Sequence, residues 1–210
     1  MAPIVCIAGR PKAGKTTLIE KLIPELKTRG HRVATIKHTS HDFQMDTEGK
    51  DSFKHARAGS DCVVLSSAGK LALLQNIDHD PEPAELARLI SGDFNIVLAE
   101  GFKKSKEPKI EVHRGEGDLV CPPDELMAVV SSQSMEVDVP RYSPEDIAGL
   151  ATLIEDKIIG RKEKIAIFAD GRPIPLKAFI INLYYKVILD LVLPLKGVGK
   201  AKRIDIWMKR

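Results

Sequence analysis

Residues 9–16 read Gly9-Arg10-Pro11-Lys12-Ala13-Gly14-Lys15-Thr16, after the apolar run 4–8 and before a segment of helical periodicity that begins at Thr17. Two glycines separated by four residues and followed by lysine and threonine form the phosphate-binding loop pattern, here in its required place between a strand and a helix. Glycine lets consecutive backbone N–H groups point into one concavity at the positive end of the helix dipole. The stretch therefore predicts a site for nucleotide phosphates in a fold of alternating strands and helices.

The last two residues of this pattern carry its chemistry. Lys15 is expected to reach the β- and γ-phosphates, which also makes it a candidate catalytic residue, and the Thr16 hydroxyl is expected to ligate Mg²⁺. The alternative interpretation is an ordinary glycine-containing turn between a strand and a helix. The apolar strand directly before the pattern, near the start of the chain, favours the nucleotide site.

The composition is that of a soluble globular protein: 43% of the 210 residues are hydrophobic and 29% are charged. No apolar run is long enough to span a bilayer. A basic region followed by an apolar region and a small-residue cleavage site is not found, so we expect no secretion signal. The three cysteines, Cys6, Cys62 and Cys121, are far apart and have no paired spacing. Cys6 and Cys62 lie in apolar, strand-like runs, so we expect buried, reduced thiols and a cytoplasmic location.

The net charge of +3 conceals an asymmetry along the chain. Residues 161–210 hold 12 Lys and Arg against 4 Asp and Glu, whereas the rest of the chain holds 20 against 25. A basic tail suggests an acidic partner, an anionic ligand or nucleic acid, or else a solvated face. With one Trp and no array of stacking aromatic residues, nucleic acid is the least favoured of these.

Strands and helices alternate along residues 1–160. Helical periodicity runs from Thr16 to about Arg29 and is ended by Gly30. Further helices are expected at 51–58, 81–90 and 144–159, the last with Ser143 as its N-cap, and strands at 32–37, 62–66, 71–74, 96–99, 110–113 and 126–130. The expected fold is therefore α/β, a P-loop NTPase-type, mostly parallel sheet flanked by helices.

The segment from 161 to 210 follows a charged junction, and we expect a domain boundary at 160. It contains a hairpin at 165–176 that turns at Asp170-Gly171, a helix at 177–193 and a closing strand at 203–208. A small C-terminal ββαβ unit of this size is marginal alone and is expected to dock on the main domain or on a partner.

Carboxylates that follow strands are the candidate metal ligands. Glu100 comes directly after the apolar strand 96–99, and in phosphate-loop proteins an acid at this place holds Mg²⁺, usually through water or the loop threonine. Glu100 is also a candidate catalytic residue. Asp46 and Asp51, in the polar stretch 37–52 after another strand, are further candidates for the metal. The base-recognition signature Asn-Lys-x-Asp is absent, so these residues do not choose between GTP and ATP.

Two other functions remain open at this point. His38, His41 and His55 could ligate a transition metal, as in a metal-delivery GTPase. Lys103 and Lys104 could hold an anionic acceptor, as in a small-molecule kinase.

Four segments resemble the MobB family of P-loop GTP-binding proteins, molybdopterin-guanine dinucleotide biosynthesis protein B. They are 9–18, 30–42 with its Ile-Lys-His-Thr-Ser-His-Asp string, 46–52 with Gly-Lys-Asp-Ser, and 97–103 with Glu-Gly-Phe. The resemblance covers about residues 3–160. Pro11 and Lys12 depart from the small residues usual in the family's loop, and the tail from 161 lies outside its core pattern.

The resemblance implies a function and a set of site residues. Such proteins bind GTP with Mg²⁺, hydrolyse it weakly, and act as adaptors for the guanylyltransferase that attaches GMP to molybdopterin. Here the triphosphate would be bound by Gly9, Arg10, Pro11, Lys12, Ala13, Gly14, Lys15, Thr16 and Thr17, with Thr16 on the metal. The family also forms homodimers, and molybdopterin is a further candidate partner of the chain. The tail from 161, which the family pattern does not include, could replace a partner contact or recruit a molybdoenzyme.

Overall fold

The computed structural model describes residues 2–39, 46–90, 92–115, 117–160, 165, 167–169, 172–196, 198–200, 204 and 206. Its centre is a six-stranded sheet in the order β2-β5-β1-β6-β7-β8, in which every neighbouring pair is parallel. The strands are β1 (Ile4–Ala8), β2 (Val33–Lys37), β5 (Ile96–Glu100), β6 (Lys109–Val112), β7 (Leu126–Val130) and β8 (Arg141–Tyr142). The predicted parallel α/β sheet is confirmed.

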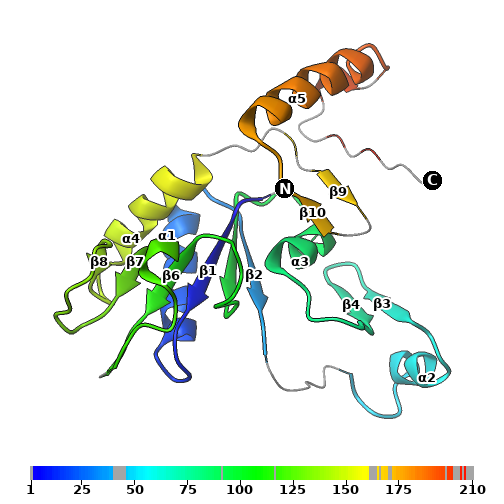
Figure 1. Ribbon diagram of the computed structural model, residues 1–210. Helices are drawn as coiled ribbons and strands as arrows, with labels where there is room; N and C mark the ends of the chain where they lie inside the picture. Colours follow the sequence, from blue (N-terminus) through cyan, green and yellow to red (C-terminus); the bar gives the residue numbers. More distant parts are fainter. Residues whose placement is uncertain are drawn as a thin grey trace.

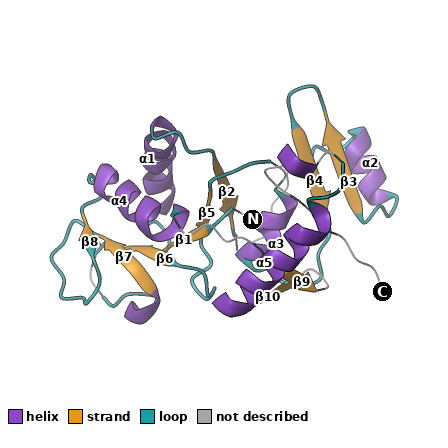
Figure 2. Ribbon diagram, turned by 90° about the horizontal axis from the view of Figure 1, so that it is seen from above, coloured by secondary structure: helices purple, strands orange, loops and turns teal. Residues whose placement is uncertain are grey.

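One face of the sheet is covered by two helices, α1 (Lys15–Thr28) and α4 (Ile147–Ile154) (Figure 2). Leu18, Leu22 and Leu26 recur at helical spacing on α1 and are all buried. They belong to one core cluster with Val5 and Ile7 of the central strand. This apolar stripe fixes α1 against β1, so the loop that joins them is held at the carboxyl end of the sheet.

The opposite face is covered in two parts. The short helix α3 (Pro83–Leu89) packs Ala84 and Ala87 against Cys6 of β1 and Ala34 of β2. Beside it, loops carrying Leu119–Cys121 and Met135–Val139 cover Ala8 and Val129; the first of these loops is followed by the 3₁₀ turn η1 (Pro123–Glu125). The core thus has three layers, and on this face part of the covering layer is loop.

Beyond β2 lies an accessory unit made of α2 (Asp51–Arg57) and the antiparallel hairpin of β3 (Cys62–Ser66) and β4 (Leu71–Gln75) (Figure 1). Helix α2 contacts β3, and Val63 is buried. The other face of the hairpin is open: Val64, Leu71 and Leu73 are exposed. The expectation that Cys62 is buried is wrong, because it lies on this open face.

The C-terminal segment begins with the predicted hairpin, β9 (Ile167–Ala169) paired with β10 (Arg172–Ile174). It contacts α3, and the Arg88 guanidinium lies 4.4 Å from the centre of the Phe168 ring. The helix α5 (Ala178–Val192) follows, and then the 3₁₀ turn η3 (Val198–Lys200). The predicted turn at Asp170-Gly171 and most of the predicted strand 203–208 lie outside the described residues.

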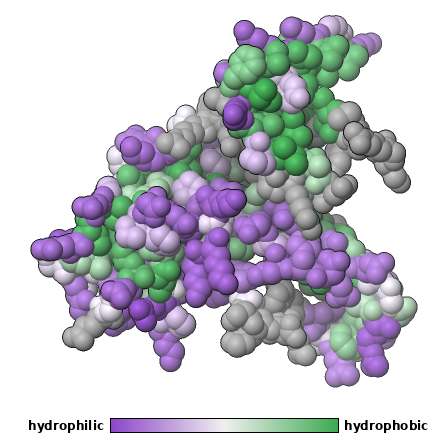
Figure 3. All heavy atoms as spheres, viewed as in Figure 1, coloured by the Kyte–Doolittle hydropathy of each residue, from purple (hydrophilic) through white to green (hydrophobic). Residues whose placement is uncertain are grey.

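Helix α5 lies near the amino ends of the strands, away from the carboxyl edge of the sheet (Figure 1). Apolar side chains gather on it (Figure 3), and five of them are exposed at every fourth position: Phe179, Leu183, Val187, Leu191 and Leu195 (the last just beyond the helix). Across the described part of the chain, no helix has both the length and the apolar character needed to cross a membrane.

The helix predicted at 144–159 differs from its prediction. Asp146, not Ser143, is the N-cap, since its carboxylate accepts a hydrogen bond of 3.0 Å from Gly149 N. The Ser143 hydroxyl instead accepts from Glu145 N, within the turn before the helix. After Ile154 the chain continues as the π-helical turn η2 (Glu155–Ile159), in which Ile158 is buried.

Candidate nucleotide-binding site

The loop between β1 and α1 has the backbone of a phosphate cradle. Gly9 and Gly14 have φ values of 141° and 103°, and Lys12 has a φ of 61°. A Cβ on Gly9 would lie only 2.4 Å from the carbonyl oxygen of Val112, at the end of β6. Glycine is therefore required at position 9 both for its dihedral angle and for the close approach of the neighbouring strand.

The Lys15 side chain lies across this loop. Its ammonium donates hydrogen bonds to the carbonyl oxygens of Arg10, at 2.8 Å, and Gly9, at 3.2 Å. The loop is closed on itself by a hydrogen bond of 3.2 Å from Ala13 N to Arg10 O. These contacts place the one lysine that the motif requires directly over the phosphate-binding loop.

Thr16 and Glu100, 84 residues apart in sequence, meet at the carboxyl end of the sheet. The Thr16 hydroxyl lies 3.1 Å from Oε1 and 3.0 Å from Oε2 of Glu100. The parallel register makes this possible, since Glu100 pairs with Ile7 of β1 on one side and with Lys37 of β2 on the other. Lys37 Nζ lies 3.6 Å from the same carboxylate.

These groups surround a cavity of about 280 Å³, lined by Lys12, Gly14, Lys15, Thr16, Thr17, Glu100 and Arg114. Three of the lining side chains are cationic and one is a carboxylate. The cavity therefore attracts an anion with several charges, and the loop N–H groups at the start of α1 suit phosphate oxygens.

The oxygen ligands in the cavity fit Mg²⁺. A threonine hydroxyl and a carboxylate lie within hydrogen-bond distance of each other, and Mg²⁺ is commonly held by one or two such groups together with substrate phosphates. No cluster of three or more His, Cys, Asp or Glu that could hold a metal is found among the described residues. The arrangement therefore suits a metal ion that binds together with the phosphates of a nucleotide. It is less suited to a metal ion that is bound permanently by protein side chains alone.

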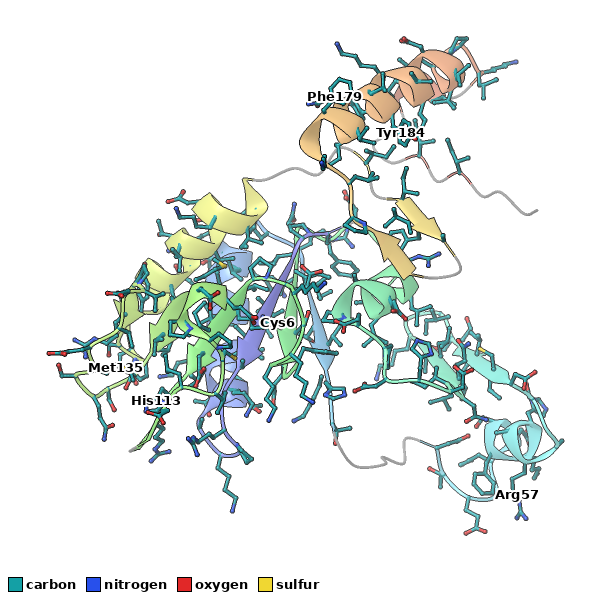
Figure 4. The ribbon with its side chains drawn as sticks, in the orientation of Figure 1. Cys6, Arg57, His113, Met135, Phe179 and Tyr184 are labelled. Carbon is teal, nitrogen blue, oxygen red and sulfur yellow. The ribbon has the colours of Figure 1, made fainter. Side chains whose placement is uncertain are left out.

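The other two predicted metal ligands lie elsewhere. Asp46 accepts hydrogen bonds from Thr47 N and the Ser52 hydroxyl, and its Oδ2 is buried with no partner among the described residues. Asp51, at the start of α2, accepts from Lys54. Neither lines the described cavity. Figure 4 shows Arg57, on the same helix as Asp51, far from His113 at the carboxyl end of β6.

Those histidines and lysines of the two alternative functions that the structure describes do not meet in a site. His38 Nε2 lies 2.9 Å from an Asp80 oxygen, and its ring lies 4.8 Å from that of Phe102. His55 is on α2, and His41 lies outside the described residues. Lys103 and Lys104 are exposed on the turn after β5 and do not line the described cavity.

A larger depression, about 530 Å³, lies between residues 117–123 and 135–137. It is open and is lined largely by apolar side chains such as Leu119, Val120 and Met135. Among the described residues that line it, the charged ones are Asp118 and Glu136, and both are acidic. It is therefore unsuited to phosphate, and the smaller cationic cavity is the better candidate for a nucleotide site.

Arg114 is the cavity residue that the sequence analysis missed. It follows β6, and only the strand order places β6 next to β1 and so brings Arg114 to the loop. The available signal was a basic residue two positions after a short strand, but the sequence does not say which strands are neighbours.

The phosphate-loop strand, the loop, Glu100 and Arg114 all fall within residues 4–132, the range matched by the family model "Molybdopterin guanine dinucleotide synthesis protein B". The chain belongs to the MobB family. The match ends just after β7, so it excludes α4 and the C-terminal segment.

Curated relatives agree with the family model. A "Molybdopterin-guanine dinucleotide biosynthesis adapter protein" of Haemophilus influenzae is 39% identical over 161 residues, covering 73% of this chain and 88% of the relative. The protein of the same name in Escherichia coli is 35% identical over 165 residues, and the alignment covers 73% of this chain and 92% of the relative. A putative adapter protein of Methanocaldococcus jannaschii is 24% identical but covers 97% of this chain, so its alignment extends through the C-terminal segment.

Solved MobB structures share the fold. The crystal structure of Bacillus subtilis MobB superimposes with a TM-score of 0.60 at 26% identity, covering 74% of this chain and 98% of that chain. A second crystal structure, of molybdopterin-guanine biosynthesis protein B, superimposes with a TM-score of 0.54 at 27% identity. The superposition covers 73% of this chain and 97% of that chain. The shared part is the P-loop α/β fold of the MobB family.

Proposed function

We propose that this chain is a GTP-binding adapter protein of molybdenum cofactor biosynthesis, acting in the cytoplasm. It would assist the guanylyltransferase that attaches GMP to molybdopterin. Two curated relatives more than 30% identical carry the adapter name, which supports the pathway. The structural observation that carries the nucleotide part is the convergence of Thr16 and Glu100 over a phosphate loop.

The proposed roles follow from the cavity. Residues 9–17 bind the triphosphate, and Lys15 neutralises its β- and γ-phosphates. Thr16 and Glu100 hold Mg²⁺, which neutralises phosphate charge when bound. Glu100 is the sole carboxylate among the described residues that line the cavity. Because that carboxylate is assigned to Mg²⁺, the described lining has no second carboxylate to act as a general base, and we expect GTP hydrolysis to be weak and binding to be the main activity.

Binding is tested by calorimetric titration of the full chain with GTP and with ATP, each with Mg²⁺. The expected result is tighter binding of GTP and loss of binding in Lys15→Ala. Tighter binding of ATP would overturn the choice of base. Unchanged affinity in Lys15→Ala would overturn the site itself.

The adapter role needs a separate assay. Purified guanylyltransferase, molybdopterin, GTP and Mg²⁺ are combined with and without this chain, and GMP attachment is followed over time. Faster or more complete attachment with the chain supports the role, and Lys15→Ala is the matched control for nucleotide dependence. An identical time course with and without the chain would contradict the adapter role and leave nucleotide binding standing.

We further propose that the chain forms a homodimer through the open face of the β3–β4 hairpin. A two-stranded hairpin is marginal without a covering layer, and here α2 covers only one face. The open face presents Val64, at 54% exposure, and Leu71, at 64%. A second copy can cover the same patch on both subunits, as a twofold interface requires.

Sedimentation of the native chain and of Val64→Lys tests the dimer. The native chain is expected to sediment as a dimer and the variant as a monomer that still binds GTP. Lys70→Ala, in the turn of the same hairpin, is the control and should stay dimeric. A native chain that remains monomeric at high concentration would exclude this interface.

The domain boundary at 160 is also a proposal. The Haemophilus influenzae relative aligns over 88% of its own length while matching only 73% of this chain. The matched part of this chain, about three quarters of it, therefore corresponds to nearly the whole length of that adapter protein. We propose that residues 161–210 are an appended basic unit, and that a chain ending at 160 keeps its GTP affinity. Loss of folding or of binding in the shortened chain would contradict the boundary.

A further inference from the structure

The β6–β7 segment, of which residues 113–115 and 117–122 are described, contacts the phosphate loop. The Gly9 backbone is packed onto the Val112 carbonyl at the start of the segment. Further along, Arg10 donates a hydrogen bond of 3.1 Å to the Asp118 carbonyl. A Cβ on Gly117 would lie 3.3 Å from the same guanidinium. The phosphate loop and the β6–β7 segment therefore form one contacting unit.

Buried polar side chains fix both ends of this segment. His113 is 6% exposed, and its Nε2 lies 3.0 Å from the Gly115 carbonyl. Glu111 is 1% exposed, and its carboxylate accepts hydrogen bonds from the backbone N–H groups of Val120, at 2.8 Å, and Cys121, at 2.9 Å. A buried carboxylate without these bonds would be strongly unfavourable, so the hydrogen bonds hold the segment in place.

Arg114 lies between these anchored residues and lines the phosphate cavity. Its side chain is exposed, and no hydrogen bond or ion pair of its guanidinium is found within the described ranges. Lys12 and Lys15 reach the cavity from the phosphate loop, whereas Arg114 reaches it from the β6–β7 segment. Cationic side chains therefore border the cavity on two sides, one following β1 and the other following β6.

We propose that Arg114 is a ligand of the terminal phosphate of the bound nucleoside triphosphate. The proposal rests on the proposed nucleotide site and adds the residue that distinguishes a triphosphate from a diphosphate. A guanidinium pairs with phosphate oxygens through two parallel N–H groups, which a lysine ammonium does not do. The loop N–H groups and Lys15 are shared by both nucleotides, so Arg114 supplies the contact that only the longer chain of phosphates receives.

The test compares a non-hydrolysable GTP analogue with GDP, both with Mg²⁺, by calorimetric titration of the full chain. Arg114→Ala is expected to weaken binding of the analogue by about 10- to 100-fold, the usual range for one lost charged hydrogen-bonding partner. Affinity for GDP should change by less than about twofold. Arg114→Lys should fall between the native chain and Arg114→Ala for the analogue, because it keeps the charge without the planar geometry.

Lys106→Ala is the matched control, since it removes an exposed positive charge from the turn after β5 without touching the described cavity. It should leave both affinities unchanged. If Arg114→Ala loses the same affinity for the analogue and for GDP, or loses none for either, the proposed role of Arg114 is overturned. The nucleotide site itself would still be supported in that case, because the native chain binds both nucleotides. Absence of binding of both nucleotides to the native chain would instead overturn the nucleotide site itself.

Discussion

The Thr16 hydroxyl lies 3.0 Å from Oε2 of Glu100, which joins the first turn of α1 to the end of β5. If the two oxygens share Mg²⁺ in the nucleotide complex, removal of either one weakens the metal site. We expect Thr16→Val and Glu100→Gln each to abolish the gain in GTP affinity that Mg²⁺ produces, a loss of about 10-fold or more. Titrations with and without Mg²⁺ measure this gain directly.

Two substitutions of the same chemical type on α1 serve as controls for this prediction. Thr28→Val lies on the last turn of α1 and Glu20→Gln lies on its exposed surface. Both should keep the full Mg²⁺ effect. Retention of that effect in Thr16→Val would show that this hydroxyl does not ligate the metal.

Gly9→Ala should be strongly destabilising. The new methyl group would lie 2.4 Å from the Val112 carbonyl oxygen, and φ at this position is 141°. Backbone must shift on one side of the contact, so we expect a loss of about 2 kcal/mol or more in the free energy of unfolding. Urea denaturation measures it. Gly69→Ala is the control, since a Cβ added there would meet no described atom within 4 Å, and its effect should be small.

Glu155 links α4 to α1 and should make stability depend on pH. The hydrogen bonds from His31 and then Arg29 hold the pKa of Glu155 below its ordinary value of 4.5. A carboxyl whose pKa is lowered in the folded state stabilises that state above its unfolded pKa. This stabilisation is lost as the pH falls through the folded pKa.

Glu155→Gln should therefore lower the Tm by a few degrees at about pH 7, and the difference should shrink as the pH falls below about 4.5. Thermal unfolding followed by circular dichroism across this range is the measurement. Asp156→Asn, at the exposed neighbouring position, should change the Tm little at any pH. An equal deficit in Glu155→Gln at both ends of the range would mean that its charge is not the cause.

The thiols should differ in reactivity. Burial raises the pKa of Cys6 to about 12 and that of Cys121 to about 11, the latter with help from the Glu111 carboxylate. At about pH 8 a thiol with a pKa of 11 is ionised in roughly one molecule per thousand. We expect iodoacetamide to modify at most Cys62 in the folded chain and all three cysteines after unfolding. Rapid modification of Cys6 in the native protein would contradict its burial.

The sequence predicts the parts of the site that are continuous in the chain. The phosphate loop is set by local spacing, and Glu100 is identifiable because a carboxylate follows a fully apolar strand. The structure adds the distance between them, which depends on the parallel pairing of β1 with β5. Sequence patterns contain no such pairing information, and for that reason they do not identify Arg114.

Two predictions, the N-cap at Ser143 and the burial of Cys62, are wrong because of the surroundings of each residue in the fold. Ser143 has the right chemistry for an N-cap, but the chain turns once more before the helix begins, and Asp146 takes that position. Cys62 lies in an apolar run typical of a buried strand, yet its hairpin has only one covered face. In both cases the residue type suits the prediction, and the tertiary surroundings decide the outcome.

The described lining of the candidate phosphate cavity comes from the first turn of α1 and from the residues at the carboxyl ends of three neighbouring strands, β5, β1 and β6. The accessory unit of α2, β3 and β4 inserts between β2 and β5, and the C-terminal segment follows η2; within the described ranges, neither lines the cavity. Changes in length or composition of these parts can therefore accumulate during evolution without moving the groups that hold the phosphates. We therefore expect relatives of this chain to differ more in these two parts than in the residues that line the cavity.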